Sequence, residues 1–332
     1  MSGALFDTRI TRLFGIKHPV LAGGLMWLSD ARYVAGIVNA GGMGFITPRS
    51  FDTLDAFRDQ LKLCRDLTEG KPFGVNLTLS SRNQNNDLVP RHIEMALEEG
   101  VRHFETVAAQ PGPLFDTIHA GGGIVLHKAS RIRYAQKAEA LGADAVCLVG
   151  MEAGGHPGMN ELPTSLMGAL AVDRIKIPLV LGGGIGSGRQ IVAALALGAD
   201  GVLMGTRFLT CHEVWAHENY KNHLVSVDEE ASTTALRSLS DTWRVLANDN
   251  ARAVQAMEAA GTRQHTDFGE RIKGTTTRDH CYRGGDVQQG MVSMGPAIGF
   301  ANRRESIADA MATLIADAAL HLQRLDTLRA TH

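Results

Sequence analysis

Cysteine is scarce in this sequence, and the pattern of the four that are present excludes two classes of protein. Cys64, Cys147, Cys211 and Cys281 are far apart in the chain and form no Cys-x-x-Cys pair. A disulfide framework and a zinc knuckle both need closely spaced cysteines. We therefore expect no metal site, and we expect the chain in a reducing compartment, the cytoplasm.

Long hydrophobic runs and a one-sided charge are also missing. No run of 18 apolar residues occurs, and residues 1–17 lack the apolar centre of a signal peptide. Lys and Arg number 33 against 35 Asp and Glu, which gives a net charge of -2. We expect neither export nor a membrane span, and nucleic acid is not an expected partner because no basic field would attract it.

Glycine, in contrast, is abundant, with 37 of 332 residues. Average proteins have ~7% glycine, so this chain exceeds the norm by about half. Glycine lets backbone come close to a neighbour or a ligand, and a phosphate-bearing ligand is one candidate for that approach. The length permits a single large α/β domain of ~250 residues with an elaboration.

Eight short apolar runs alternate with segments of helical periodicity. Residues 54–67, 89–99, 132–141 and 189–197 carry apolar side chains at helical spacing. Eight repeats of strand followed by helix predict a closed parallel sheet, a TIM (β/α)8 barrel. The runs are 18–23, 42–47, 73–79, 101–106, 123–128, 143–150, 178–183 and 201–206.

Two further patterns divide the chain. Residues 140–146 and 196–202 repeat each other as ALGADAV and ALGADGV, which indicates a recurrent helix-to-strand turn without a chemical role. After the eighth run, residues 211–294 are polar and predict a mostly helical cap that forms the substrate domain. Residues 1–210 and 295–332 then form the barrel. The helical pattern of 303–329 is read as the last barrel helix, with a homodimer face as the alternative.

The segments after the expected strands are rich in glycine, at the rim where TIM-barrel active sites lie. Residues 182–188 follow the seventh strand and 205–207 follow the eighth, the usual place of a phosphate site. A dinucleotide fingerprint is excluded because Ser187 stands at its last glycine position, and no Gly-Lys-Ser/Thr follows to make a P-loop. We therefore expect a phosphate cradle here.

These motifs resemble the nitronate monooxygenase (2-nitropropane dioxygenase-like) family of FMN-dependent TIM barrels over nearly the whole chain. Residues 282–295 are similar to a branch of that family that contains NAD(P)H:quinone reductases. The motifs that carry the resemblance are His18-Pro19, Gly23-Gly24, Asn39-Ala40-Gly41-Gly42, Phe73-Gly74-Val75-Asn76, Glu152-Ala153-Gly154-Gly155-His156, Gly183-Gly184-Ile185 and Met204-Gly205-Thr206-Arg207-Phe208.

The resemblance implies an FMN site across the rim. The isoalloxazine ring would lie near Gly23 and Gly24, and Asn76 and Lys128 would reach the edge of the ring or the ribityl chain. A lysine at that edge would stabilise the anionic reduced flavin. The remaining residues implied for the cofactor are Ala22 in the first loop, Gly183, Gly184, Gly205 and Thr206 at the phosphate, Gly154 under the ring, and Ser293 in the closing segment of the cap.

One histidine stands out among the 13 in the chain. His156 follows two glycines after the sixth strand, at the place of the family's catalytic acid or base, and an imidazole suits proton removal from a nitroalkane. Ala22 marks a departure, because the family commonly has a glutamine before the two glycines. Gln110, His127 and Glu152 are nearby polar residues to which the sequence assigns no role.

The hypothesis from sequence is an FMN oxidoreductase, first of all a nitronate monooxygenase that oxidises alkyl nitronates with O₂. An NAD(P)H:quinone reductase and an FMN-dependent enoyl-thioester reductase are the alternatives, so the expected partners are a nitronate, a quinone or NAD(P)H. Enzymes of the inosine monophosphate dehydrogenase type resemble residues 182–205 as well. They need a nucleophilic cysteine after strand six, and residues 151–163 contain none.

Overall fold

The computed structural model describes residues 4–79, 86–107, 111–159 and 161–328. Its main body is a closed barrel of eight parallel strands in chain order, in which β8 pairs with β1 through Val202 and Val20. The predicted TIM barrel is confirmed. The strands are β1 (Val20–Ala22), β2 (Met43–Ile46), β3 (Gly74–Thr78), β4 (His103–Val107), β5 (Ile124–Ala129), β6 (Ala145–Val149), β7 (Leu179–Gly182) and β8 (Gly201–Met204).

Alternation along the strands separates two hydrophobic layers. Leu21, Met43 and Phe45 belong to the cluster inside the barrel, which also contains Phe14 of α1 (Arg9–Phe14). The rings of Phe14 and Phe45 meet edge to face, with centroids 6.4 Å apart, so α1 closes the end of the barrel where the strands begin. The neighbouring strand residues, such as Val20, pack outward against the helices.

Some of the helices between the strands begin at polar caps that the sequence supplies. Asp30 accepts a hydrogen bond from Tyr33 N–H at the start of α2, and Thr53 accepts one from Ala56 N–H at the start of α3. The helices are α2 (Ala31–Asn39), α3 (Leu54–Leu67), α4 (Val89–Glu98), α5 (Gly112–Ala120), α6 (Ile132–Ala140), α7 (Thr164–Ala171), α8 (Gly188–Ala196) and, after the cap, α12 (Ile307–Thr327).

The two repeated turns lie where β6 and β8 begin, at the end of the barrel away from the rim. Gly142 and Gly198 adopt left-handed φ values of 95° and 96°. The carboxylate of Asp144 accepts from Val125 N–H at 2.7 Å, and that of Asp200 accepts from Leu179 N–H at 2.9 Å. Each aspartate ties its own strand to the preceding one, which is an architectural role.

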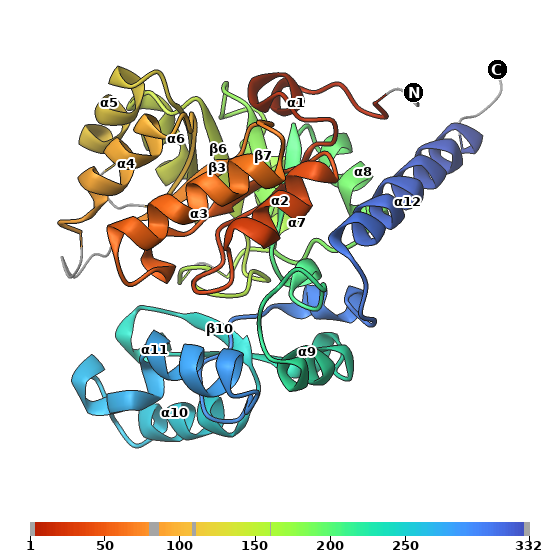
Figure 1. The fold of residues 1–332 in the computed structure, drawn as a ribbon. Coiled ribbons are helices and arrows are strands. Elements are labelled where there is room, and N and C mark those ends of the chain that lie inside the picture. Colours follow the sequence, from red (N-terminus) through yellow and green to blue (C-terminus); the bar gives the residue numbers. More distant parts are fainter. Residues whose placement is uncertain (1–3, 80–85, 108–110, 160, 329–332) are drawn as a thin grey trace.

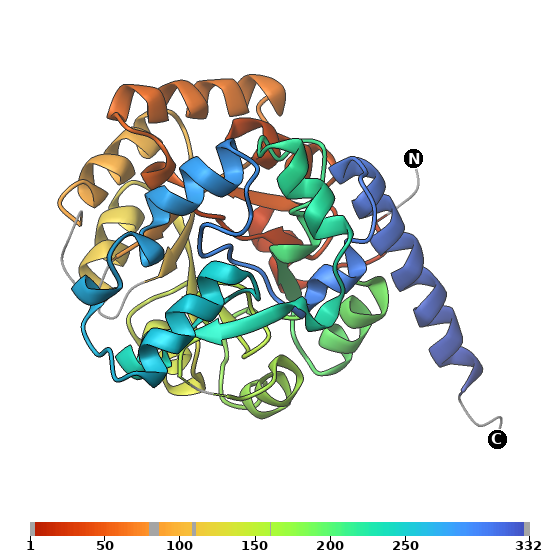
Figure 2. The ribbon, with the colours of Figure 1, turned by 90° about the horizontal axis from the view of Figure 1, so that it is seen from below.

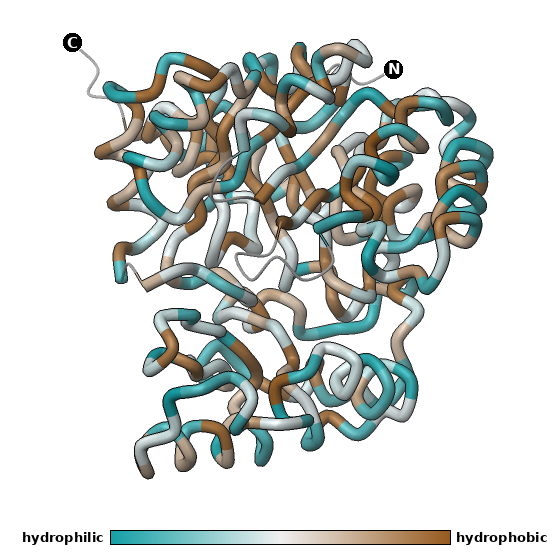
Figure 3. The backbone as a smooth tube through the Cα atoms, turned by 90° about the vertical axis from the view of Figure 1, so that its left-hand side faces the viewer, coloured by the Kyte–Doolittle hydropathy of each residue, from teal (hydrophilic) through white to brown (hydrophobic). Residues whose placement is uncertain are grey.

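The cap forms a separate layer below the barrel in Figure 1 and lies across the rim in the view from below. Figure 3 shows the same two layers, with more hydrophobic segments in the upper one. The cap contains α9 (Glu218–Val225), α10 (Asp249–Ala259), α11 (Gly274–Thr276) and several 3₁₀ or π turns, as expected. It also contains an antiparallel hairpin, β9 (Ser232–Ala235) with β10 (Trp243–Leu246), that the sequence did not predict.

A buried ion pair holds the chain where it returns from the cap to the barrel. Arg207 follows β8, and its guanidinium lies 2.7 Å from the carboxylate of Glu305, with side chains 4% and 6% exposed. Arg303 donates to the other carboxylate oxygen at 2.9 Å. Glu305 therefore joins the end of the last strand to the start of α12.

Removing the Glu305 carboxylate should destabilise the protein strongly. Glu305→Ala leaves the Arg207 charge buried without its partner, a change that costs about 3–5 kcal/mol in comparable cases. Urea denaturation would measure the loss in the free energy of unfolding. Glu94→Ala, which removes an exposed ion pair with Arg91, should leave the unfolding curve nearly unchanged. Equal effects of the two substitutions would contradict the role of the pair.

Within the described ranges, no helix combines the length and the apolar character needed to cross a bilayer. The same ranges hold no cluster of three His, Cys, Asp or Glu side chains suited to a metal ion.

Candidate active site at the rim of the barrel

A fully buried carboxylate joins three of the predicted site residues. Glu105 of β4 is 0% exposed and lies beside Asn76 of β3 in the strand register. Its Oε2 accepts from the backbone N–H of Gly24 at 2.9 Å and from the Nδ2 amide of Asn76. The ammonium of Lys128 on β5 lies 3.2 Å from Oε1. The strands β3, β4 and β5 and the loop after β1 thus meet at one anionic side chain.

Sequence reasoning missed Glu105, although a signal for it exists. A single carboxylate stands inside the apolar run 101–106, and a charge is rarely buried in a strand without a partner. The sequence did not show that the partners are Asn76 and Lys128, which come from strands on either side of β4.

The two glycines after β1 are required by close packing against this network. A Cβ on Gly24 would lie 2.4 Å from Cβ of Asn76, and one on Gly23 would lie 2.9 Å from Oε1 of Glu105. Ala22 is fully buried, and its side chain belongs to the cluster between strands and helices. Only the main chain of Ala22 can therefore face the rim.

The loops after β7 and β8 leave backbone donors available. Gly183 and Gly184 adopt φ values of 103° and 71°. The N–H groups of Gly184, Ile185 and Gly205 donate to no acceptor in the part of the chain that is described. A Cβ on Gly205 would have one neighbour, Cδ2 of Leu25 at 3.2 Å. Free N–H groups beside open space on two adjacent strands fit the phosphate group of a cofactor.

Glu152 supports this cradle from behind. Its carboxylate accepts from Thr164 N–H, at 3.2 and 3.0 Å for the two oxygens, at the start of α7. A Cβ on Gly184 would lie 2.9 Å from Cβ of Glu152. The hydroxyl of Thr164 also lies 2.9 Å from the carbonyl oxygen of Gly183. Glu152 therefore positions the loop after β7, a role that the sequence left open.

His156 is held by the cap hairpin. Its ring stacks on Trp243 of β10, with centroids 4.8 Å apart, and its Nδ1 lies 3.2 Å from Oδ1 of Asp241. The preceding Gly155 exchanges two backbone hydrogen bonds with Arg244, so the loop after β6 pairs with the edge of the hairpin. The side chain of His156 remains 48% exposed. A ring that is held on one side and open on the other can exchange a proton with a ligand.

The segment that closes the cap reaches the same place. The hydroxyl of Ser293 accepts from the indole N–H of Trp243 at 2.8 Å, so Ser293 is joined to His156 through that ring. A Cβ on Gly154 would lie 2.7 Å from the backbone of Met294. The N–H of Gly295 donates to the hydroxyl of Thr206 at 3.0 Å. Gly154 and Thr206 therefore serve as docking points for the returning chain.

The predicted site residues form three groups around the strand ends. Gly23, Gly24, Asn76 and Lys128 surround Glu105; Gly183, Gly184 and Gly205 form the cradle; His156, Gly154, Thr206 and Ser293 adjoin the cap. Leu25 bridges the first two groups because its side chain faces Gly205.

Asp241 and Trp243 were not predicted, and their cap segment carries no motif that would have pointed to them. Gln110 lies outside the described residues.

His127 belongs to the barrel wall. It is 3% exposed, its Nδ1 lies 2.9 Å from the hydroxyl of Thr106, and its ring meets that of Phe115 edge to face. Burial, together with the Lys128 ammonium, lowers the pKa of His127 to about 4. A neutral ring packed in this way has a structural role.

Acid should destabilise the protein over the pH range in which buried histidines such as His127 resist protonation. Burial likewise lowers the pKa of His18, His92 and His103 to about 4, from 6.5. The unfolded chain takes up protons below pH 6.5 that the folded chain refuses, so stability is complete above that pH and falls as the pH drops toward 4. Thermal melting between pH 7.5 and 4.5 would measure it. A constant midpoint over this range would contradict the burial of neutral rings.

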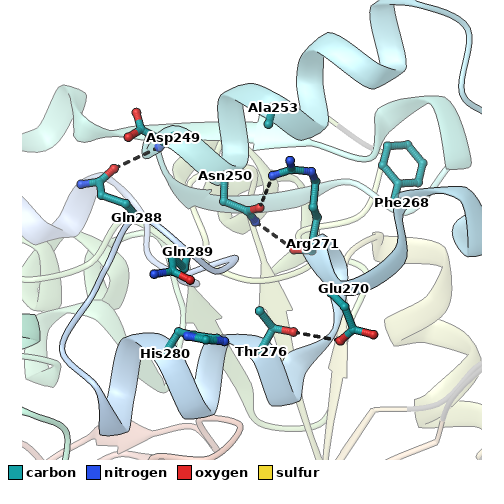
Figure 4. Close-up of a pocket in the computed structure, with 10 residues that line it drawn as sticks. All are labelled: Asp249, Asn250, Ala253, Phe268, Glu270, Arg271, Thr276, His280, Gln288 and Gln289. Carbon is teal, nitrogen blue, oxygen red and sulfur yellow. Dashed lines mark hydrogen bonds between the residues drawn. The ribbon is translucent and has the colours of Figure 1, made fainter.

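A cavity of 710 Å³ lies within the cap, and none of the residues that line it is a predicted site residue (Figure 4). Its polar groups largely satisfy one another. Asn250 exchanges two hydrogen bonds with Arg271, and Gln288 accepts from Asp249 N–H at 3.0 Å. The hydroxyl of Thr276 faces Glu270. This cavity therefore offers few free partners to a ligand.

Comparison with known proteins identifies the family. The family model described as nitronate monooxygenase matches residues 7–317. The chain belongs to the nitronate monooxygenase family. The resemblance expected from the motifs is confirmed, and the protein is an enzyme of a flavin-dependent family of oxidoreductases.

Individual relatives differ in their named activities. A (3aS,4S,5R,7aS)-5-hydroxy-7a-methyl-1-oxo-octahydro-1H-indene-4-carboxyl-CoA dehydrogenase of Rhodococcus jostii is 33% identical over 76% of this chain and 69% of its own length. A probable nitronate monooxygenase of Staphylococcus aureus is 29% identical over 70% of this chain and 76% of its own. The structure of FabK from Thermotoga maritima superposes with a TM-score of 0.88 at 28% identity, over 98% of this chain and 100% of that one.

Proposed function

We propose that this enzyme is an FMN-dependent oxidoreductase of alkyl nitronates, with O₂ as the oxidant. The family match supports the reaction class. The observation that carries the proposal is the arrangement at the rim, where free N–H groups of Gly184 and Gly205 fit a cofactor phosphate and His156 stands beside open space. When bound, FMN would accept electrons from the substrate and pass them to the oxidant.

The chain's own residues would do the remaining work. The loops with Gly183, Gly184, Gly205 and Thr206 would bind the phosphate, and Asn76 and Lys128 would face the ring. Asp241 beside Nδ1 of His156 favours a proton on that nitrogen and leaves Nε2 to take the proton from the carbon next to the nitro group of a neutral nitroalkane. This step would form the nitronate that is then oxidised. Trp243 would keep the imidazole in this orientation by stacking.

An acyl-CoA oxidoreductase is the second candidate. It is favoured by the 33% identical Rhodococcus relative, whose name includes a carboxyl-CoA dehydrogenase. The chemistry is related, because a thioester carbonyl acidifies the neighbouring C–H as a nitro group does, so His156 would have the same task. The cap of residues 211–294 would then decide between the substrates, since it supplies Asp241, Trp243 and Ser293 around His156.

Anaerobic mixing of the purified protein with candidate reductants tests the proposal. Propyl nitronate should bleach the flavin absorbance, and air should restore it. Bleaching by an acyl-CoA alone would establish the second candidate, and bleaching by NADH or NADPH alone would establish the quinone or enoyl-thioester reductase alternatives. A flavin that no nitronate reduces would contradict the proposal.

Self-association stays a prediction. The first part of α12 packs against α8 and α2, while its far end projects beyond the barrel with Leu320 and Leu325 exposed. Sedimentation velocity would test for a homodimer.

A further inference from the structure

Glu105 has a place in the site that the proposed function does not explain. It is the carboxylate under the rim that contacts the Gly24 loop, Asn76 and Lys128 together. We propose that Glu105 is a positioning residue that cancels the charge of Lys128 at the flavin site and so keeps the reduction potential of the flavin low. This inference rests on the proposed flavin site at this rim.

The first argument is the charge balance around Lys128. Its side chain is 18% exposed and that of Glu105 is 0% exposed, so water screens the pair poorly. The titratable neighbours are uncharged at neutral pH, because burial lowers the pKa of His127 to about 4 and raises the pKa values of the Cys147 thiol and the Tyr33 phenol. Glu105 is therefore the counter-charge of Lys128.

The second argument is how the two oxygens of Glu105 are used. Oε2 takes both neutral donors, Gly24 N–H and the Asn76 amide. Oε1 accepts no oriented hydrogen bond within the described residues, and it is the atom that faces the ammonium. A glutamine could still accept from Gly24 and Asn76, but it would present an amide to the lysine. The negative charge of Glu105 is therefore needed only at Oε1, where it faces the ammonium of Lys128.

The consequence concerns the flavin. An unpaired ammonium close to the ring would stabilise the electron-rich reduced form and raise its potential. A paired ammonium keeps its place as a donor while its long-range field is largely cancelled. Lys128 would then orient the ring without making it a strong oxidant.

The test compares Glu105→Gln with the double variant Glu105→Gln/Lys128→Met at pH 7. The readouts are the midpoint potential of the bound flavin and the affinity for sulfite, an anion that adds to oxidised flavins and bleaches them. Glu105→Gln should shift the potential to a more positive value and tighten sulfite binding on the order of tenfold. The double variant, in which neither charge remains, should return both values toward those of the wild type.

Melting of the flavin-free proteins gives a readout that does not depend on the cofactor. Glu105→Gln should lower the melting temperature, because a buried ammonium loses its partner, and the double variant should recover part of the loss. If Glu105→Gln does not fold, the double variant carries the test, and it should fold with the sulfite affinity of the wild type.

The outcomes separate this inference from the function on which it rests. If the wild-type protein binds flavin, and the single and double variants shift the potential and the sulfite affinity equally or not at all, the role of Glu105 is overturned. The proposed function stands in that case. A wild-type protein that binds no flavin would overturn the proposed function, and the inference with it.

Discussion

His156→Ala should retain its flavin and lose turnover of a neutral nitroalkane by about 10²- to 10⁴-fold, the usual contribution of a positioned acid or base. The substitution removes an imidazole that is held by Trp243 and Asp241 and is exposed on its other side, but it removes no contact of the phosphate cradle. Stopped-flow measurement of flavin reduction and reoxidation would locate the loss in the half-reaction that moves a proton.

The chain offers a matched control for this experiment. Nε2 of His119 lies 2.9 Å from Oδ2 of Asp144, and both side chains are about as exposed as those of His156 and Asp241. His119 belongs to α5, however, and Asp144 to the turn before β6. His119→Ala should therefore leave turnover unchanged. If both half-reactions of His156→Ala run at wild-type rates with every substrate tried, His156 has no catalytic role.

Gly205→Val should lower flavin affinity by about 100-fold or more, which corresponds to about 2.7 kcal/mol, while the melting temperature of the flavin-free protein stays nearly constant. Gly205 has a negative φ of -127°, outside the left-handed region that requires glycine, and a Cβ there meets only Leu25, at 3.2 Å. The added side chain would fill the space beside the free N–H groups. Fluorescence titration with FMN would measure the affinity.

Gly184→Val gives the informative comparison. Gly184 has a left-handed φ of 71°, and a Cβ would lie 2.9 Å from Glu152. This variant should lose both flavin affinity and stability, because its backbone must change. If Gly205→Val binds FMN as tightly as the wild type, the loop after β8 does not hold the phosphate.

The barrel could be predicted from the sequence because its strands are buried on both faces. Each of the eight apolar runs contains one strand or nearly all of it, with ends that differ by at most two residues. The rim followed from the same pattern, since glycine-rich segments come directly after the strands. Position in the fold thus pointed to Gly183 and Gly205 without any knowledge of their contacts, whereas Asn76, which lies within β3, was implied by the family resemblance.

The hairpin of the cap resisted prediction for a physical reason. β9 is the short polar segment Ser232–Ala235, and it becomes a strand by pairing with β10 and packing against α10 rather than through its own pattern. Asp241 contacts His156 across 85 positions of sequence, and Glu105 contacts Gly24 across 81. Such contacts depend on how the chain folds back, which local periodicity does not encode.

The most direct test of the account is the identity of the cofactor released by heating the purified protein. The account predicts a yellow protein that releases FMN in a ratio near one per chain, and wild-type protein stripped of it should take up FMN again. A colourless protein that does not bind FMN, or one that releases FAD, would contradict the assignment of the rim loops as a cradle for a single phosphate.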